Sequence, residues 1–215
     1  MFQKIDWANL QNPHLFINGD CMEYMKTMPD KYVDLCICDP PYGIGASRGG
    51  NGSRGHKYDR SNKNAWDDKI PDEFYWKELF RVSKNQIIWG MNNYILPSTQ
   101  HFIVWNKKQP DGVTFAQAEL AWTSFNGTSK IYSLSSNGQP DRTHPTQKPV
   151  ALYEWLLTNY AKQGDKILDT HVGSASSLVA CHNLGFEYVG FEIDADYYKM
   201  ARERLEAVKA QERLF

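Results

Sequence analysis

The stretch Lys166-Ile167-Leu168-Asp169-Thr170-His171-Val172-Gly173-Ser174-Ala175-Ser176-Ser177 decides the fold class. An apolar run leads into a turn of small residues and then into a helical pattern, which is typical of a strand–turn–helix unit. The next apolar run ends in Glu192, about 20 residues beyond the turn, where an acid is placed to accept two ribose hydroxyls. The unit lacks the second and third glycines of the dinucleotide-binding motif, so an ordinary strand–helix turn stays an alternative.

Outside this unit, short apolar runs alternate with helical patterns. Helical patterns begin at Pro71-Asp72-Glu73, near Pro149, after Ser176 and near Asp194. The expected strands are Leu15–Asn18, Val33–Cys38, Gln86–Trp89, Phe102–Trp105, Glu119–Trp122, Lys166–Leu168 and Tyr188–Phe191. This alternation predicts an α/β fold in which helices cover both faces of a mostly parallel sheet, with residues 1–215 forming a single domain.

Composition excludes several classes of protein. The 215-residue chain has a formal net charge of −1 and 13% aromatic residues, which argues against a disordered chain. We find no apolar run of about 18 residues, as a membrane span needs, and no secretory signal, so we expect a cytoplasmic protein. The four cysteines lack zinc-site spacing, and we interpret them as buried thiols and expect no metal site: Cys21, Cys36, Cys38 and Cys181.

The tetrapeptide Asp39-Pro40-Pro41-Tyr42 follows the apolar run Val33–Cys38. Two successive prolines fix the backbone and form a rigid exit from the strand. We expect them to aim the Asp39 carboxylate, the Pro40 carbonyl and the Tyr42 ring into the cleft at the strand ends. Two acceptors beside one stacking face suit a flat ring that carries an amino group, whereas the alternative is a surface turn with a chance aromatic residue.

Four expected strands end in an acid, namely Asp20, Asp39, Asp169 or Glu192. Ligands of open α/β sheets bind at the carboxyl ends of the strands, so these acids are candidates for one site. Each acid taken singly has the alternative of being only a helix N-cap.

Two polar segments interrupt the pattern. Residues 43–64 are rich in Gly, Ser and Asn and carry five basic residues against one acid, and residues 124–141 contain Gly127 and Gly138. Neither segment has the composition of a core, so we expect both to be loops. The alternative for the first is a solvated connector without a partner.

Taken together, these motifs resemble the amino-methyltransferases of DNA in the permuted arrangement called the β class, which transfer a methyl group from S-adenosylmethionine to adenine N6 or cytosine N4. The resemblance rests on the order of the Asp20 turn, Asp39-Pro40-Pro41-Tyr42, Thr143-His144-Pro145-Thr146-Gln147-Lys148-Pro149, the Asp169–Ser177 turn and Glu192. It implies a Rossmann-like domain with a seven-stranded sheet. It also implies a duplex DNA substrate whose target base is flipped, and it leaves open a homodimer and a cognate restriction endonuclease.

The resemblance assigns roles to individual residues. Asp39 and the Pro40 carbonyl would accept hydrogen bonds from the target amino group, Pro41 would stiffen the turn, and Tyr42 would stack on the base. The residues implied at the cofactor are Asp20, Cys21, Asp39, His144, Thr146, Lys148, Asp169, His171, Gly173, Ser174, Glu192 and Ile193. Those implied at DNA phosphates are Arg48, Arg54, Lys57, Arg60 and Lys107.

The chain departs from the family pattern at three points. Ala175 stands where the family has glycine, and if that position needs a positive φ, alanine costs about 1 kcal/mol. His171 replaces an apolar ring at the turn, which favours a packing or hydrogen-bonding role over that of a catalytic base. Residues 124–141 are short for a target-recognition segment.

Three alternatives to an adenine-N6 enzyme follow from the same residues. Asp at the first position of the tetrapeptide favours adenine, but the resemblance extends to N4-cytosine enzymes. Ala175 and the short recognition segment motivate a non-catalytic DNA- or cofactor-binding relative. A nicotinamide-dependent oxidoreductase on a similar sheet would leave Asp39-Pro40-Pro41-Tyr42 unexplained.

Overall fold

An eight-stranded sheet organises the chain in a computed structural model, which describes residues 4–45, 67–112, 116–135 and 147–212. The strands are β1 (His14–Asn18), β2 (Val33–Cys38), β3 (Ser83–Trp89), β4 (Phe102–Asn106), β5 (Ala118–Thr123), β6 (Lys130–Ser133), β7 (Lys166–Asp169) and β8 (Glu187–Glu192). Their spatial order is β1-β8-β7-β2-β3-β5-β4-β6. All neighbours pair in parallel except β5, which is antiparallel to β3 and to β4.

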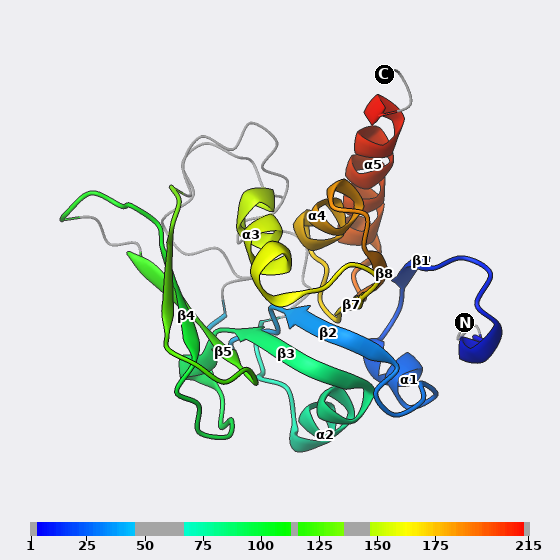
Figure 1. The fold of residues 1–215 in the computed structure, drawn as a ribbon, viewed down its shortest axis with the longest axis horizontal. Coiled ribbons are helices and arrows are strands. Elements are labelled where there is room, and N and C mark those ends of the chain that lie inside the picture. Colours follow the sequence, from blue (N-terminus) through cyan, green and yellow to red (C-terminus); the bar gives the residue numbers. More distant parts are fainter. Residues whose placement is uncertain (1–3, 46–66, 113–115, 136–146, 213–215) are drawn as a thin grey trace.

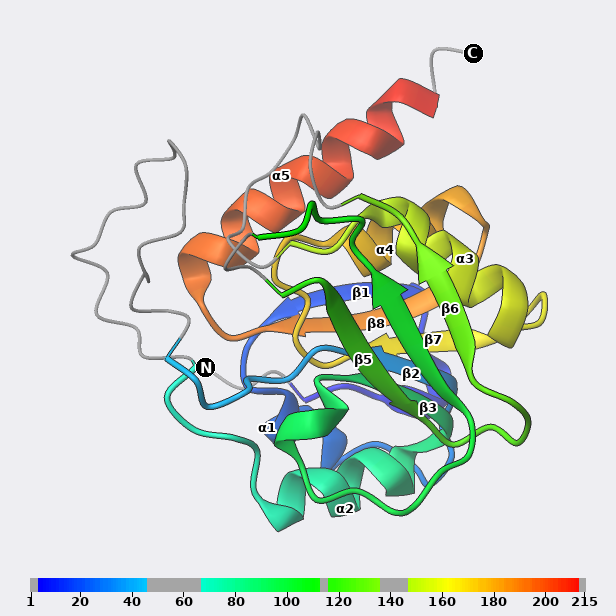
Figure 2. The same cartoon turned by 90° about the vertical axis from the view of Figure 1, so that its left-hand side faces the viewer.

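Helices cover both faces of this sheet. They are α1 (Cys21–Met25), α2 (Glu73–Val82), α3 (Val150–Tyr160), α4 (Ser176–Asn183) and α5 (Ala195–Glu212). Helices α1 and α2 lie against one face, and α3, α4 and α5 lie against the other (Figures 1 and 2). The sequence-based prediction of an α/β fold with a mostly parallel sheet is confirmed. None of the helices in the described ranges is long and apolar enough to cross a membrane.

The core divides into two layers because side chains of a strand alternate between the faces of a sheet. On β2, Leu35 and Ile37 pack with the layer under α3, α4 and α5. Cys36 and Cys38 point the other way, into the layer under α1 and α2. Both thiols are free and fully buried, as expected for Cys-x-Cys on a strand.

The expected strand count of seven is wrong, because β6 adds an eighth strand. It lies within residues 124–141, which the sequence indicated to be a loop. The strand has only four residues and pairs with β4 alone, and Ile131 is 70% exposed. A four-residue edge strand buries few side chains. Its sequence therefore does not show the alternation of apolar and polar residues from which strands are predicted.

Local sequence explains where two helices begin. Asp72 caps α2, since its carboxylate accepts the Tyr75 N–H at 2.9 Å. Asp194 caps α5 by accepting from the N–H groups of Asp196 and Tyr197 at 2.9 and 3.1 Å. Capping carboxylates satisfy amide groups that have no partner inside the helix and favour its positive end.

Ala175 immediately precedes α4 and has a φ of +62°, with its side chain fully buried. The position does have a positive φ, which is the condition under which the sequence predicts a cost for alanine. We expect Ala175→Gly to raise the free energy of unfolding by about 1 kcal/mol, because glycine adopts this conformation without steric cost. Urea denaturation measures the change.

Gly173→Ala is the matched control for Ala175→Gly. Gly173 also has a positive φ, +55°, and a Cβ there would meet no atom within 4 Å. Only backbone strain is added, so stability should fall by a similar amount. An Ala175→Gly variant no more stable than the wild type would contradict the strain at this position.

Candidate active site at the carboxyl edge of the sheet

Four neighbouring strands, β1, β8, β7 and β2, deliver their acids to one edge of the sheet. Asp39 follows β2 directly, Asp169 ends β7, Glu192 ends β8, and Asp20 lies two residues beyond β1. The chain leaves β2 for β3 on one side and returns in β7 on the other. The acids therefore surround the point where strand order reverses, which is where open α/β sheets bind ligands.

The corner Asp39–Tyr42 is held by hydrogen bonds to its backbone. Asp67, which is 1% exposed, accepts from the N–H groups of Tyr42 and Gly43 at 2.6 and 3.0 Å. The Tyr94 hydroxyl donates to the Pro40 carbonyl at 2.6 Å. These bonds add to the rigidity of the two prolines and fix the direction of the Pro40 carbonyl.

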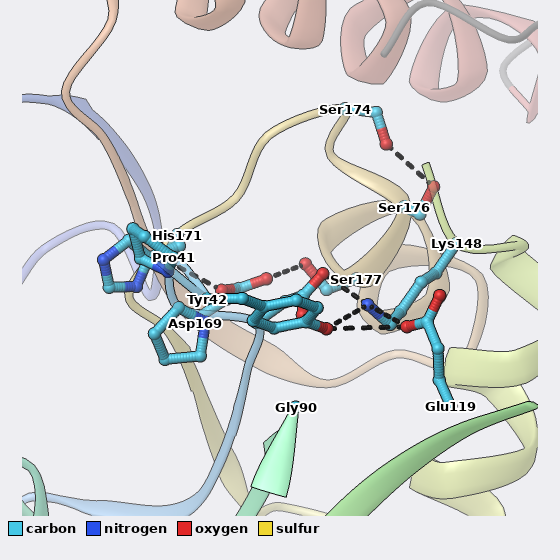
Figure 3. A network of polar contacts seen from close by, with 12 residues as sticks. Pro41, Tyr42, Gly90, Glu119, Lys148, Asp169, His171, Ser174, Ser176 and Ser177 are labelled. Atoms are coloured by element: carbon cyan, nitrogen blue, oxygen red, sulfur yellow. Dashed lines mark hydrogen bonds and ion pairs between the residues drawn. The ribbon is translucent and has the colours of Figure 1, made fainter. Parts of the chain in front are cut away.

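The Tyr42 ring lies on the backbone of Gly90, just after β3 (Figure 3). A Cβ on Gly90 would stand 2.2 Å from Tyr42 Cε1, and Gly90 has a φ of +77°. Glycine is thus required here by both backbone conformation and close approach. The tyrosine hydroxyl turns toward Asp39 and donates to its Oδ1 atom at 2.5 Å.

A row of alternating charges extends from this corner. Lys148 Nζ contacts Asp39 Oδ2 and also pairs with Glu119 Oε2 at 2.9 Å. Glu119 Oε1 in turn contacts Lys107 Nζ. We call these four residues the charge row. They come from the corner after β2, from β5, from the segment before α3 and from the segment after β4, and Figure 3 shows Lys148 and Glu119 beside the Tyr42 hydroxyl.

Burial and neighbouring charges together set the ionisation of the charge row. Burial raises the pKa of Asp39 above its usual range, against the pull of Lys148. Burial works against the charge on Lys148, but Asp39 and Glu119 outweigh it and raise the lysine's pKa. Burial likewise opposes the charge on Glu119, yet Lys148 and Lys107 bring its pKa to about 2. Lys148 and Glu119 are therefore both charged at neutral pH.

A pocket at the carboxyl ends of β1, β7 and β8, at the same edge of the sheet as the corner, brings together many of the residues expected at a cofactor. Its lining is Gly19, Asp20, Cys21, Thr170, His171, Glu192 and Ile193. Glu192 accepts from the N–H groups of Gly173 and Asp194 at 2.8 and 2.9 Å, one on each carboxylate oxygen. A carboxylate offers about four lone-pair sites, so it can accept further hydrogen bonds while it is held in place.

The pocket residues fit the nucleoside part of the implied cofactor. Glu192 presents an oriented acceptor for hydroxyl groups, and Ile193 is 64% exposed at the pocket wall, where it offers an apolar surface. Gly173 leaves the space beside its backbone open, since a Cβ would meet nothing within 4 Å. An acceptor for a sugar, an apolar wall for a ring and an open backbone match the chemistry of a nucleoside.

Three further residues expected at the cofactor have clear structural partners. Asp20 caps α1 by accepting the Met22 N–H at 2.9 Å. Asp169 is 2% exposed and accepts from Ser177 Oγ at 2.5 Å and from the His171 N–H at 3.0 Å. His171 contacts Thr170 and packs edge-on against the Tyr75 ring. Burial lowers its pKa to about 4, so the imidazole is neutral at pH 7.

Several expected residues have partners that the sequence did not indicate, and others lie outside the described ranges. Lys107, expected at a DNA phosphate, instead turns its ammonium inward to Glu119, and its side chain is 16% exposed. Lys148, expected at the cofactor, contacts Asp39. Ser174 is buried, and its hydroxyl contacts that of Ser176. The expected residues outside the described ranges are Arg48, Arg54, Lys57, Arg60, His144 and Thr146.

Sequence reasoning missed Glu119, Gly90, Tyr94 and Asp67. Glu119 opens an apolar run, whereas the acids predicted for the site stand at or just after the ends of such runs. Because β5 is antiparallel to its neighbours, its first residues lie at the same edge as the last residues of the parallel strands. An acid at the start of an antiparallel strand is the signal that would have found it.

Comparison with known proteins identifies similar chains. A family model described as DNA methylase matches residues 97–203. The YubD protein of Escherichia coli strain K12 is 28% identical over 90% of this chain and 91% of its own length. Type II methyltransferase M.HinfI of Haemophilus influenzae is 26% identical over 90% of this chain and 68% of its own length. The crystal structure of the M1.HpyAVI–SAM complex is 19% identical, with a TM-score of 0.58, and the match covers 88% of this chain and 98% of that one.

Proposed function

We propose that the chain is a DNA methyltransferase of the N6-adenine and N4-cytosine family, whose model it matches over residues 97–203, and that it methylates N6 of adenine in DNA. The observation that carries this proposal is the corner at the end of β2. There a carboxylate and a carbonyl, Asp39 and Pro40, stand beside the ring of Tyr42, at the same edge of the sheet as the pocket at Glu192.

The chemistry needs two acceptors at one place. The lone pair of an aromatic amine is delocalised into its ring, so the nitrogen is a poor nucleophile. Hydrogen bonds from the two N–H groups to Asp39 and to the Pro40 carbonyl would hold these hydrogens out of the ring plane and localise the lone pair. The carboxylate also stabilises the positive charge that grows on nitrogen as the new bond forms.

The methyl donor would bind in the pocket at Glu192. Glu192 would accept the ribose hydroxyls, Asp20, Cys21 and Ile193 would surround the adenine, and Gly173 would pass along the amino-acid part. When bound, S-adenosylmethionine supplies a methyl group on a sulfonium, whose electron pair stays with sulfur when the C–S bond breaks. The chain contributes orientation, which converts a bimolecular encounter into an aligned transfer.

Access to the amino group requires that the base leave the duplex. Gly90 supports one face of the Tyr42 ring, so a flipped base would stack on the opposite face. We propose that the basic residues of the segment 43–64 hold the flanking phosphates, since phosphate contacts position DNA without reading its sequence. These residues are Arg48, Arg54, Lys57 and Arg60.

The second candidate is methylation of cytosine N4. The family includes both kinds of enzyme, and an exocyclic amino group of either base offers the two N–H donors that Asp39 and Pro40 would accept. We favour adenine because the first acceptor is a carboxylate, as the resemblance to adenine enzymes implies.

The decisive experiment measures methyl transfer to unmethylated DNA with labelled S-adenosylmethionine, followed by nucleoside analysis of the product. We expect N6-methyladenine. N4-methylcytosine as the only product would reverse the base assignment. Cofactor binding measured by calorimetry together with an absence of any methylated base would instead favour a non-catalytic relative.

A further inference from the structure

Donors from the chain already engage all three acceptor atoms at the corner. Asp39 Oδ1 accepts from the Tyr42 hydroxyl at 2.5 Å, and Oδ2 contacts Lys148 Nζ. The Pro40 carbonyl accepts from Tyr94 at 2.6 Å. A carbonyl keeps a second lone pair, so Tyr94 need not leave when an amino group enters. Lys148 is different, because its full charge neutralises the carboxylate on which the transfer depends.

Lys148 is shared between two carboxylates. Its side chain is 2% exposed, and its ammonium lies between Asp39 Oδ2 and Glu119 Oε2. It also lies over the Trp89 and Tyr42 rings, 5.3 and 5.8 Å from their centroids. An ammonium so buried cannot move to water without losing these contacts. Lys148 also donates to the Tyr42 hydroxyl at 3.3 Å, but Glu119 is the second carboxylate within reach and can balance the lysine's charge when Asp39 turns to the substrate.

We propose that Glu119 is a positioning residue for methyl transfer: it retains Lys148 when the target amino group takes the Asp39 carboxylate. The inference rests on the proposed function. It also gives Lys107 a role, since its ammonium balances the charge of Glu119 and limits how strongly Glu119 holds Lys148. Neither residue touches the substrate in this account.

The test compares Glu119→Gln in two backgrounds. With Lys148 present, an amide cannot balance the ammonium, so the lysine stays on Asp39 and kcat falls about 10- to 100-fold, the scale of a charge-assisted hydrogen bond. In the Lys148→Met background no ammonium competes for Asp39, and the same change no longer lowers kcat. A merely structural glutamate would lower kcat equally in both backgrounds, and that result would overturn the proposal.

Glu78→Gln is the matched control. Glu78 pairs with Arg81 at 2.7 Å on α2, and its side chain is 18% exposed against 22% for Glu119. This ion pair lies near the start of β3, at the opposite edge of the sheet. The control should leave kcat and cofactor affinity unchanged. A lower kcat in Glu119→Gln would then be due to the contact of Glu119 with Lys148, and not to the removal of a half-buried ion pair in general.

A second readout does not need activity. Titration of the Asp39 carboxyl by ¹³C NMR should show a lower pKa in Glu119→Gln, because the glutamate's negative charge raises it and because Lys148 then serves Asp39 alone. The groups that face Asp39 and enter this balance are Lys148, Glu119, Tyr42, Tyr94 and Asp169. An unchanged or higher pKa would overturn the sharing of Lys148.

The two readouts separate this inference from the proposed function. A wild-type chain that methylates neither base contradicts the function, and the carboxyl titration still decides whether Glu119 shares Lys148. A wild-type chain that methylates DNA while Glu119→Gln keeps the full kcat overturns the role of Glu119 alone.

Discussion

Asp39→Ala should lower kcat about 10³-fold or more while cofactor affinity changes little. The variant loses the only ionised acceptor at the corner, and removal of one preorganised group that stabilises transition-state charge costs about 10²–10³-fold. It also leaves the Lys148 ammonium where the positive charge would grow, which adds to the loss. Methyl transfer under saturating conditions measures kcat, and calorimetry measures cofactor binding at the pocket by Glu192.

Asp34→Ala is the control for this variant. Asp34 lies on β2, the strand that Asp39 follows, and pairs with Lys84 at 2.6 Å, but at the edge of the sheet away from the corner. Its removal should leave kcat unchanged. An Asp39→Ala variant that kept most of the wild-type rate would contradict the role of the carboxylate, whatever the control showed.

Gly90→Ala should cost both stability and turnover. Its new Cβ would stand 2.2 Å from Tyr42 Cε1, and alanine at a φ of +77° adds strain of about 1–2 kcal/mol. The Tyr42 ring has to move, which removes its hydroxyl from Asp39 and changes the face offered to a flipped base. We expect a loss of unfolding free energy of about 2–5 kcal/mol and a fall in kcat/KM for DNA, since overpacking adds about 1–3 kcal/mol to the strain.

Gly112→Ala separates strain from the clash. Gly112 has a φ of +79°, almost that of Gly90, but a Cβ there would meet nothing within 4 Å. The control should therefore show the backbone strain alone, with the rate unchanged. If both variants lost the same stability and Gly90→Ala kept its activity, the Tyr42 ring would not depend on Gly90.

The parallel framework could be predicted because its residues follow regular patterns. Seven of the eight strands coincide with apolar runs in the sequence. The acids at or just after the ends of β1, β2, β7 and β8 mark the carboxyl edge of the sheet. Parallel strands end at the same edge of a sheet, so the sequence alone predicts that Asp39 and Glu192 lie at one edge.

The partners of these residues could not be predicted, because they depend on which strands become neighbours. Glu119 reaches Lys148 only because β5 inserts in the antiparallel direction between β3 and β4. Lys107, just after β4, pairs with Glu119 for the same reason, because β4 lies next to β5. Asp67 and Tyr94 act on backbone groups of the corner, and nothing in their own sequence context indicates a hydrogen bond to a distant turn.

The hydrogen bond from the Gly45 N–H to the Asp67 carbonyl, 3.0 Å long, joins the two ends of the segment 46–66. Asp67 also holds the Asp39–Tyr42 corner through the N–H groups of Tyr42 and Gly43. The number of residues between Gly45 and Asp67 can therefore change without moving Asp39. Doubling the length of a flexible loop raises the free energy of closing it by only about 0.6 kcal/mol. Insertions or deletions between Gly45 and Asp67 should therefore leave the Asp39–Tyr42 corner in place.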